Sequence, residues 1–194
     1  MRVGRVSDTT TTFVTSAKSA SPAKSAETDA DFVLRAPSEK DGARIHQLIK
    51  ACPPLDVNSL YAYLLLTTHF SQTSLVAEQQ GRIVGFVSAY IPPSKSDVLF
   101  VWQVAVHEQC RGHALGIRML KRLLRRAALA RIQYVETTVS PDNPASRAMF
   151  ARVAEHYSTA INEEAWFGTE HFGPQQHAEE PLLRIGPLPT RTAI

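Results

Sequence analysis

The chain has 194 residues, of which 44% are hydrophobic and 20% charged, and 21 basic against 18 acidic side chains give a net charge of +3. This size and composition predict one soluble globular domain rather than a fibrous or wholly disordered protein. The longest apolar run, Val98–Val106, is interrupted by Gln103 and is too short to cross a bilayer. The small positive excess does not demand a nucleic-acid partner.

The first 30 residues are dense in Ser, Thr and Ala and hold few large apolar side chains. Such a segment buries too little surface to offset the entropy lost on ordering. We therefore expect a disordered tail over residues 1–30 and a single domain over residues 31–194. Arg2 and Arg5 precede no apolar stretch, which argues against a secretory signal. A transit peptide stays open, because the segment is rich in Ser and Thr, although its few carboxylates weigh against it.

The chain contains two cysteines, Cys52 and Cys110. Their number and spacing support neither a disulfide framework nor a metal site. We therefore expect two free thiols in a reducing compartment and no bound metal.

Hydrophobic periodicity and turn residues predict two helices and three strands in the first half of the domain. Ser38 followed by Asp41 resembles a capping box at the start of the first helix, and paired prolines stiffen the segment after it. Asn58 or Ser59 can cap the second helix. The expected elements are a strand at 32–36, a helix at 38–50, a helix ending near 67, and strands at 73–78 and 82–91 around a hairpin turn.

The second half of the domain contains the strongest periodic signals. Val98–Val106 is a nearly continuous apolar strand of the kind found at the centre of a sheet. Residues 114–128 predict an amphipathic helix, with an apolar stripe on one side and basic side chains mostly elsewhere. The remaining expected elements are a strand at 132–139, a helix from 144 to about 157, and strands near 158–161 and 182–185. This order of elements is typical of a three-layer α/β protein.

Between the central strand and the amphipathic helix lies the segment QCRGHA, residues 109–114. A helix start offers unpaired backbone N–H groups and the positive end of the helix dipole, and a glycine lets the backbone approach an anion closely. This combination suits a pyrophosphate. Arg111 either contacts phosphate or is solvated, and His113 is expected to act through its backbone N–H rather than its imidazole.

This segment matches the Gln/Arg-x-x-Gly-x-Gly/Ala pattern of the GNAT acetyltransferases, which the chain resembles. The resemblance implies acetyl-CoA as co-substrate and a central mixed, mostly antiparallel sheet flanked by helices. It also implies that the central strand parts from its neighbour and pairs with the pantetheine arm, while an amide near Val104 stabilises the oxyanion. The implied cofactor-binding residues are Val104, Val106, Arg111, Gly112, His113, Ala114, Leu115, Gly116 and Asn143.

A second GNAT-like block runs from Asp142 to Phe150. By resemblance, Asn143 helps to hold coenzyme A. The position of Phe150 is often a tyrosine that protonates the leaving thiolate, so the phenylalanine leaves the identity of the general acid open. Tyr157, seven residues further on, is either the substitute acid or a half-buried packing residue.

Several stretches resemble the diaminobutyrate acetyltransferase family in particular, over about residues 31–187. They include CPPLDVNS at 52–59, FVWQVAV at 100–106 and E-x-L-x-RIGP at 180–187. The resemblance implies acetyl transfer from acetyl-CoA to the γ-amine of L-2,4-diaminobutyrate. In that family the reaction is a step of ectoine biosynthesis, a response to osmotic stress, and the enzyme is a cytoplasmic homodimer.

That substrate carries a carboxylate, an α-ammonium and a γ-amine. Only the neutral γ-amine attacks a thioester, although a free alkylamine resembles lysine, with a pKa of about 10.4. A neighbouring carboxylate keeps the α-ammonium charged and in place. The resemblance assigns substrate binding to Asp56, Tyr61, Trp102 and Glu180. Each has a structural alternative: Asp56 as a helix cap, Tyr61 and Trp102 as packing residues, and Glu180 as a surface charge.

Glu136 is a candidate general base that acts through a water molecule, and the alternative is a buried carboxylate held by backbone donors. The expected catalytic set is Val104, Glu136 and Tyr157. We expect direct transfer in a ternary complex, because Cys110 lies in the phosphate loop and Cys52 precedes two prolines, so that neither is placed as a nucleophile.

Other functions stay open. The same fold can acetylate a different small amine, or the chain is a non-catalytic acyl-CoA sensor, a reading that Phe150 favours. Nucleic-acid binding is suggested by the isoelectric point of 9.0, but no aromatic platform is interleaved with the basic residues at 118–126. The expected partners are therefore the amino-acid substrate, acetyl-CoA and a second copy of the chain, without nucleic acid or membrane.

Overall fold

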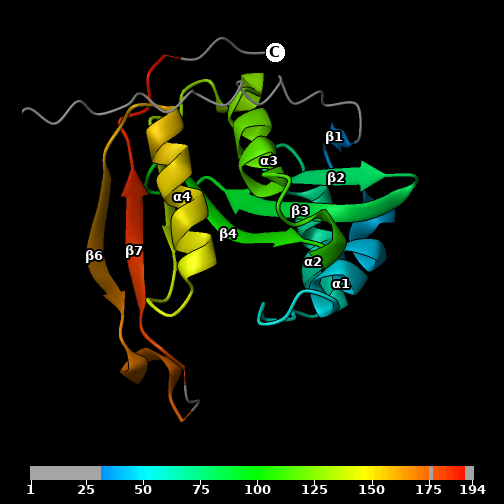
Figure 1. Cartoon of the computed structure of the whole chain (residues 1–194), viewed down its shortest axis with the longest axis horizontal. Helices are drawn as coiled ribbons and strands as arrows, with labels where there is room; N and C mark the ends of the chain where they lie inside the picture. Colours follow the sequence, from blue (N-terminus) through cyan, green and yellow to red (C-terminus); the bar gives the residue numbers. More distant parts are fainter. Residues whose placement is uncertain (1–31, 175–176, 191–194) are drawn as a thin grey trace, which may run out of the picture.

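The computed structural model describes residues 32–174 and 177–190, which form one sheet with helices on both faces (Figure 1). The strands are β1 (Val33–Arg35), β2 (Leu75–Gln79), β3 (Arg82–Tyr90), β4 (Val98–Val106), β5 (Tyr134–Thr138), β6 (Ile161–Phe167) and β7 (Glu180–Ile185). The helices are α1 (Gly42–Lys50), α2 (Leu60–Thr68), α3 (Leu115–Leu124) and α4 (Pro144–His156). Short 3-10 turns are η2 (Glu39–Asp41), η3 (Glu108–Cys110), η4 (Ala127–Leu129) and η5 (Thr169–Phe172).

The seven strands lie in the order β1-β2-β3-β4-β5-β7-β6, and all neighbours are antiparallel except β4 and β5. The predicted three-layer α/β architecture with a mixed, mostly antiparallel sheet is confirmed. The predicted tail over residues 1–30 lies outside the described residues. Within the described ranges, no helix is long and apolar enough to cross a membrane.

The first two helices follow the predicted pattern with small changes at their ends. The helix predicted at 38–50 begins as η2 before it continues as α1. The expected capping box is present, because Ser38 N donates to the Asp41 carboxylate at 2.8 Å. Ser59 rather than Asn58 caps α2, and its side chain accepts from Ala62 N at 3.2 Å.

The C-terminal end of the helix predicted at 114–128 is wrong, because α3 stops at Leu124 and the 3-10 turn η4 follows. Arg126 leaves the helical conformation, and its Nη1 donates to the carbonyls of Ser71, Gln72 and Ser74 at 3.2, 3.1 and 2.6 Å. These bonds tie the end of α3 to the segment that leads into β2. Periodicity cannot reveal such a long-range contact.

The strand predicted near 158–161 is misplaced, since β6 spans Ile161–Phe167. Every residue of β6 is exposed, and the strand lies at the edge of the sheet. An edge strand with no buried face carries no alternation of apolar and polar residues, and this is the signal on which the prediction depended. β7 begins two residues before the predicted strand at 182–185.

Helices α3 and α4 cover one face of the sheet and α1 and α2 cover the other (Figure 1), and a hydrophobic core lies under each pair. The first packs α3 and α4 against the sheet, and Met119 and Leu123 are completely buried in it. The second packs α1 and α2 around Ile45, Tyr63 and Phe86, which are also completely buried. The helix pairs therefore hold β3 and β4 from opposite sides.

A β-bulge in β4 changes the face that its side chains meet. Ser88 pairs with Gln103 and Ala89 pairs with Val101, so Trp102 is the extra residue. Before the bulge, Val101 belongs to the core of α3 and α4. After the bulge, Gln103 turns toward α2 on the other face, while Trp102 is 46% exposed.

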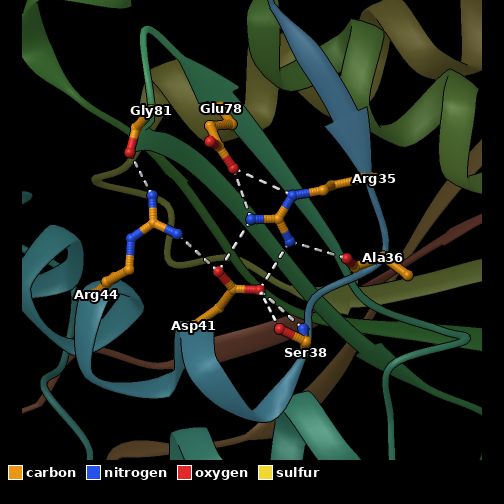
Figure 2. Close-up of polar contacts among 7 residues, drawn as sticks. All are labelled: Arg35, Ala36, Ser38, Asp41, Arg44, Glu78 and Gly81. Carbon is orange, nitrogen blue, oxygen red and sulfur yellow. Dashed lines mark hydrogen bonds and ion pairs between the residues drawn. The ribbon is translucent and has the colours of Figure 1, made fainter.

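An ion-pair network joins β1, η2 and β2 beside α1 (Figure 2). The Arg35 guanidinium donates to the Asp41 carboxylate at 2.7 and 3.0 Å and to Glu78 at 2.6 and 3.1 Å. Arg44 donates to Asp41 at 3.0 Å and to the Gly81 carbonyl at 2.6 Å. The bonds from Arg35 lower the pKa of the buried Asp41 carboxyl from 3.8 to about 2. The network thus fixes the first strand and the first helix to each other.

Asp41→Asn should lower the free energy of unfolding at neutral pH by about 2 kcal/mol, the amount that corresponds to this pKa difference. A carboxyl whose folded pKa is depressed stabilises the fold above its unfolded pKa, and this contribution disappears as the pH falls from 3.8 toward about 2. Urea unfolding at neutral pH measures the first effect, and the same measurement repeated at decreasing pH down to this range measures the second, with exposed Glu39→Gln in the same turn as the control. Equal stabilities of Asp41→Asn and wild type at neutral pH would contradict the assignment.

Candidate functional site

β4 parts from β5 partway along its length. The parallel pairing begins at Val98 and ends where Phe100 pairs with Glu136, whereas β4 stays paired with β3 as far as Val106. From residue 101 onward, the edge of β4 that faces β5 therefore has no strand partner in the described part of the chain. The parting of the central strand that the family resemblance implied is confirmed.

The backbone groups of Val104 and Val106 face this opening. His107 N donates to Val84 O across the β3–β4 pair at 2.8 Å. Because alternate residues of a strand direct their backbone groups toward the same neighbour, those of Val104 and Val106 point away from β3, toward the β5 side. The Val106 carbonyl accepts from Arg111 Nε at 3.2 Å, which ties the following loop to the end of the opening.

The loop after β4 contains a row of backbone N–H groups without an acceptor. Gly112 has φ +83°, and Ala114, the N-cap of α3, has φ +53° and provides no side-chain cap. The N–H groups of residues 112–117 donate to no other described residue, and the helix that Leu115 begins is ten residues long. Since an uncapped helix start carries the positive end of the helix dipole, this loop fits the pyrophosphate that the sequence predicted there.

The side chains of this loop do not cover its backbone at Gly112, which stays accessible to a ligand. Arg111, Gly112 and His113 are exposed, and a Cβ added at Gly112 would meet no atom within 4 Å. His113 Nδ1 lies 3.1 Å from the Arg111 carbonyl, so the imidazole stays beside its own loop. Gly116 is buried, and a Cβ there would approach Met149 Sδ to 2.6 Å. The lack of a side chain at position 116 therefore lets α3 and α4 pack closely beside the loop.

The second GNAT-like block begins α4. Asn143 caps this helix, because its Oδ1 accepts from Ser146 N at 3.1 Å, and the side-chain NH2 keeps its two donors. Phe150 is 3% exposed in the core. Tyr157 follows the end of α4, is half-buried and packs against the same core as Val104. This position is compatible with both roles that the sequence left open for Tyr157, the general acid and the packing residue.

Asp56 lies in the loop before α2 and is attached through its backbone to Gln103 at the bulge of β4. Its carbonyl accepts from Gln103 Nε2 at 2.8 Å. Its carboxylate is exposed and has no hydrogen-bond or ion-pair partner among the described residues. The alternative that Asp56 caps α2 is wrong, because Ser59 caps this helix with its own side chain.

Tyr61 is 68% exposed in α2, and Glu180 is partly exposed at the start of β7, paired with Phe167 of the edge strand. No hydrogen bond, ion pair or ring contact in the described ranges joins either residue to Asp56 or Trp102. The four predicted substrate residues thus come from four segments of the fold: the loop before α2, α2 itself, β4 and β7. The exposure of Tyr61 and Trp102 contradicts the alternative in which their side chains are core packing.

Glu136 is 3% exposed and lies between two cations. Lys95 Nζ donates to its two oxygens at 3.1 and 3.0 Å, and Arg184 donates to Oε1. The donors are side chains and not the backbone groups considered from the sequence. Since cations occupy both oxygens, the structure favours a structural role for Glu136 over that of a general base.

Gln103 and Tyr63 are residues to which the sequence assigned no role. Tyr63 is completely buried, and its hydroxyl lies 3.4 Å from Gln103 Oε1. A lone amide inside an apolar strand is a signal that could have singled out Gln103, because a buried amide needs partners.

The sequence profile of the acetyltransferase (GNAT) family matches residues 43–154. The chain is 53% identical over 158 residues to an L-2,4-diaminobutyric acid acetyltransferase of Bordetella parapertussis, which covers 81% of this chain and 85% of that protein. It is 45% identical over 158 residues to the Halomonas elongata protein of the same name, with 81% and 82% covered. A solved structure of a diaminobutyrate acetyltransferase from Paenibacillus lautus, in complex with L-2,4-diaminobutyric acid and coenzyme A, matches with a TM-score of 0.79 and 41% identity over 81% of this chain and 95% of that one. The chain therefore belongs to the acetyltransferase (GNAT) family and, within it, to the L-2,4-diaminobutyric acid acetyltransferases.

Proposed function

We infer that this chain transfers the acetyl group of acetyl-CoA to the γ-amine of L-2,4-diaminobutyrate and produces N-γ-acetyl-L-2,4-diaminobutyrate. The observation that carries this inference is the unpaired edge of β4 that leads to the free N–H groups of residues 112–117. An unpaired strand edge beside a helix start suits a ligand with an amide-bearing arm and a pyrophosphate. The identity to relatives of that name supports the choice of acceptor.

Acetyl-CoA lies along this path. Its pyrophosphate accepts from the N–H groups at the start of α3, and its pantetheine amides pair with the backbone of β4 in place of a strand. The proposed cofactor-binding residues are Val104, Val106, Arg111, Gly112, His113, Ala114, Leu115, Gly116 and Asn143.

The acceptor binds on the other side of the same opening. The free carboxylate of Asp56 pairs with the α-ammonium and keeps it protonated, and therefore unable to attack. Tyr61, Trp102 and Glu180 complete the proposed substrate site. Glu180 adds a second negative charge for a substrate that enters with two ammonium groups.

The reaction is a direct transfer. The γ-ammonium loses a proton to water, and the neutral nitrogen attacks the thioester carbon while the N–H of Val104 stabilises the oxyanion. The attacking nitrogen then loses its second proton to water, the C–S bond breaks, and Tyr157 is the proposed proton donor to the CoA thiolate. Burial raises the pKa of both the Cys52 and Cys110 thiols, which keeps them in the poorly nucleophilic protonated form and argues against an acetyl-cysteine intermediate.

Product identification by NMR after incubation with acetyl-CoA and diaminobutyrate tests the function. We expect acetylation at the γ-nitrogen and stoichiometric release of CoA thiol. Turnover with other amines but not with diaminobutyrate would assign a different acceptor. Binding of acetyl-CoA without turnover of any amine would instead identify an acyl-CoA sensor.

We further propose that the protein is a cytoplasmic homodimer that acts in ectoine synthesis under osmotic stress. The edge strand β6 supports self-association, because Ile161, Trp166 and Phe167 are 38%, 45% and 41% exposed on it. Exposed apolar residues on an unpaired strand edge are typical of a surface that another chain covers. Light scattering in solution should give the mass of two chains, and the mass of one chain would refute the dimer.

A further inference from the structure

Gln103 is held by three hydrogen bonds at the bulge of β4. Gln103 is only 6% exposed, and its Nε2 donates to Asp56 O at 2.8 Å. Its Oε1 accepts from Tyr63 OH at 3.4 Å, and its backbone N donates to Ser88 Oγ at 3.1 Å. The bulge is what turns this amide away from the core of α3 and α4 and toward the loop before α2.

Tyr63 holds the other side of the same loop. Its hydroxyl accepts from Asn58 N at 3.2 Å, two residues beyond Asp56. The Tyr63 ring is completely buried and lies 5.7 Å from the His46 ring and 6.4 Å from the Phe86 ring. Backbone groups on both sides of the Asp56 side chain are therefore attached to rigid parts of the fold.

The loop between α1 and α2 is also attached to β4 near the point where the loop begins. Cys52 Sγ lies 3.6 Å from the Val106 carbonyl. The two attachment points on β4, Gln103 and Val106, thus flank Val104, whose N–H faces the opening between β4 and β5. The carboxylate of Asp56 and the amide of Val104 are fixed to the same four residues of one strand.

We propose that Gln103 is a positioning residue that sets the distance between the carboxylate of Asp56 and the thioester held at Val104, and thereby the chain length of the acceptor. This inference rests on the proposed function. The α-ammonium bound at Asp56 and the nitrogen that reaches the thioester belong to one small molecule. A fixed span between the two groups therefore selects the number of methylenes between its nitrogens.

The test compares diaminobutyrate with ornithine, which is one methylene longer, as acceptors for wild type and Gln103→Leu. We expect the ratio of the two kcat/KM values to fall about tenfold in the variant, since the loss of a buried hydrogen bond releases the loop. KM for acetyl-CoA should stay within about twofold of wild type, because its proposed contacts are backbone groups. The ratio does not depend on the fraction of protein that is folded, so a loss of stability alone leaves it unchanged.

Tyr63→Phe removes the hydroxyl but leaves the bond from Gln103 to Asp56. It should shift the ratio in the same direction by a smaller factor, and it carries the test if Gln103→Leu does not fold. Thr67→Val is the matched control, because Thr67 is buried in α2 and donates only to Leu64 O at 2.9 Å. Its ratio should equal that of wild type.

The outcomes distinguish a failure of the proposed function from a failure of the role of Gln103. Wild-type protein that leaves diaminobutyrate unreacted overturns the proposed function and this role with it. Wild-type turnover of diaminobutyrate together with an unchanged ratio in Gln103→Leu, or in Tyr63→Phe if the former does not fold, overturns the role of Gln103 alone.

Discussion

Gly112→Glu should weaken the binding of acetyl-CoA by about 100-fold or more while the protein keeps its fold. The substitution places a carboxylate in the loop whose N–H groups are proposed to hold the pyrophosphate. A juxtaposition of like charges costs several kcal/mol, and about 1.4 kcal/mol corresponds to a factor of ten. The fold should survive, because a Cβ added at this exposed position would meet no atom within 4 Å. Isothermal titration calorimetry measures the change in Kd.

Gly81→Glu is a close control for this substitution. Gly81 has φ +74°, compared with +83° at Gly112, and its added Cβ would also meet nothing within 4 Å. Both variants therefore carry the same added charge and a similar backbone strain, but Gly81 lies in the turn between β2 and β3. Gly81→Glu should bind acetyl-CoA as wild type does. Equal affinities of the two variants would remove the pyrophosphate from the loop before α3.

Asp56→Ala should lower kcat/KM for diaminobutyrate about 30-fold or more, mainly through KM, with little change in KM for acetyl-CoA. Once the bound acceptor covers this carboxylate the two charges form a buried pair, and removal of one partner from such a pair typically costs about 2 kcal/mol or more. The loop should keep its conformation, because the attachment to Gln103 uses the carbonyl of Asp56 and not its carboxylate. Steady-state kinetics with each substrate varied in turn separate the two KM values.

Asp56→Asn isolates the effect of the charge, and Glu155→Ala is the control for the loss of a carboxylate elsewhere. The asparagine keeps the size of the side chain and one acceptor oxygen but removes its charge, so it should lose most of the same activity if the charge holds the α-ammonium. Glu155→Ala removes an exposed carboxylate from α4 and should change neither KM. Parallel rises of both KM values in Asp56→Ala would exclude Asp56 from acceptor binding.

The order of the elements could be predicted because each element carries its own local signal. The apolar run of β4, the amphipathic pattern of α3 and the capping box at Ser38 depend on residues that are close in sequence. The same holds for the proposed pyrophosphate loop, since a glycine and a helix start are adjacent along the chain. Errors arose where the local signal was absent, as in the fully exposed β6, or where a distant contact ended an element, as Arg126 does after α3.

The candidate site could be predicted only in part for the same reason. Residue types and family resemblance pointed to Asp56 and to the backbone of β4, but they did not indicate which groups hold that strand and that loop together. The alternative roles of Glu136 could not be separated either, because its partners Lys95 and Arg184 lie 41 and 48 residues away in sequence. Such partners become visible only when the strands are assembled.

The sequence by itself thus determined most of the elements, their order, the family and the position of the proposed pyrophosphate loop, since these depend on short-range patterns. Only the tertiary structure decided where β4 parts from β5, that Trp102 is the extra residue of a bulge, and that Gln103 meets Asp56. The physical reason is that strand register and buried hydrogen bonds are set by the packing of segments far apart in sequence. No local pattern records which polar group will meet another once the core has formed.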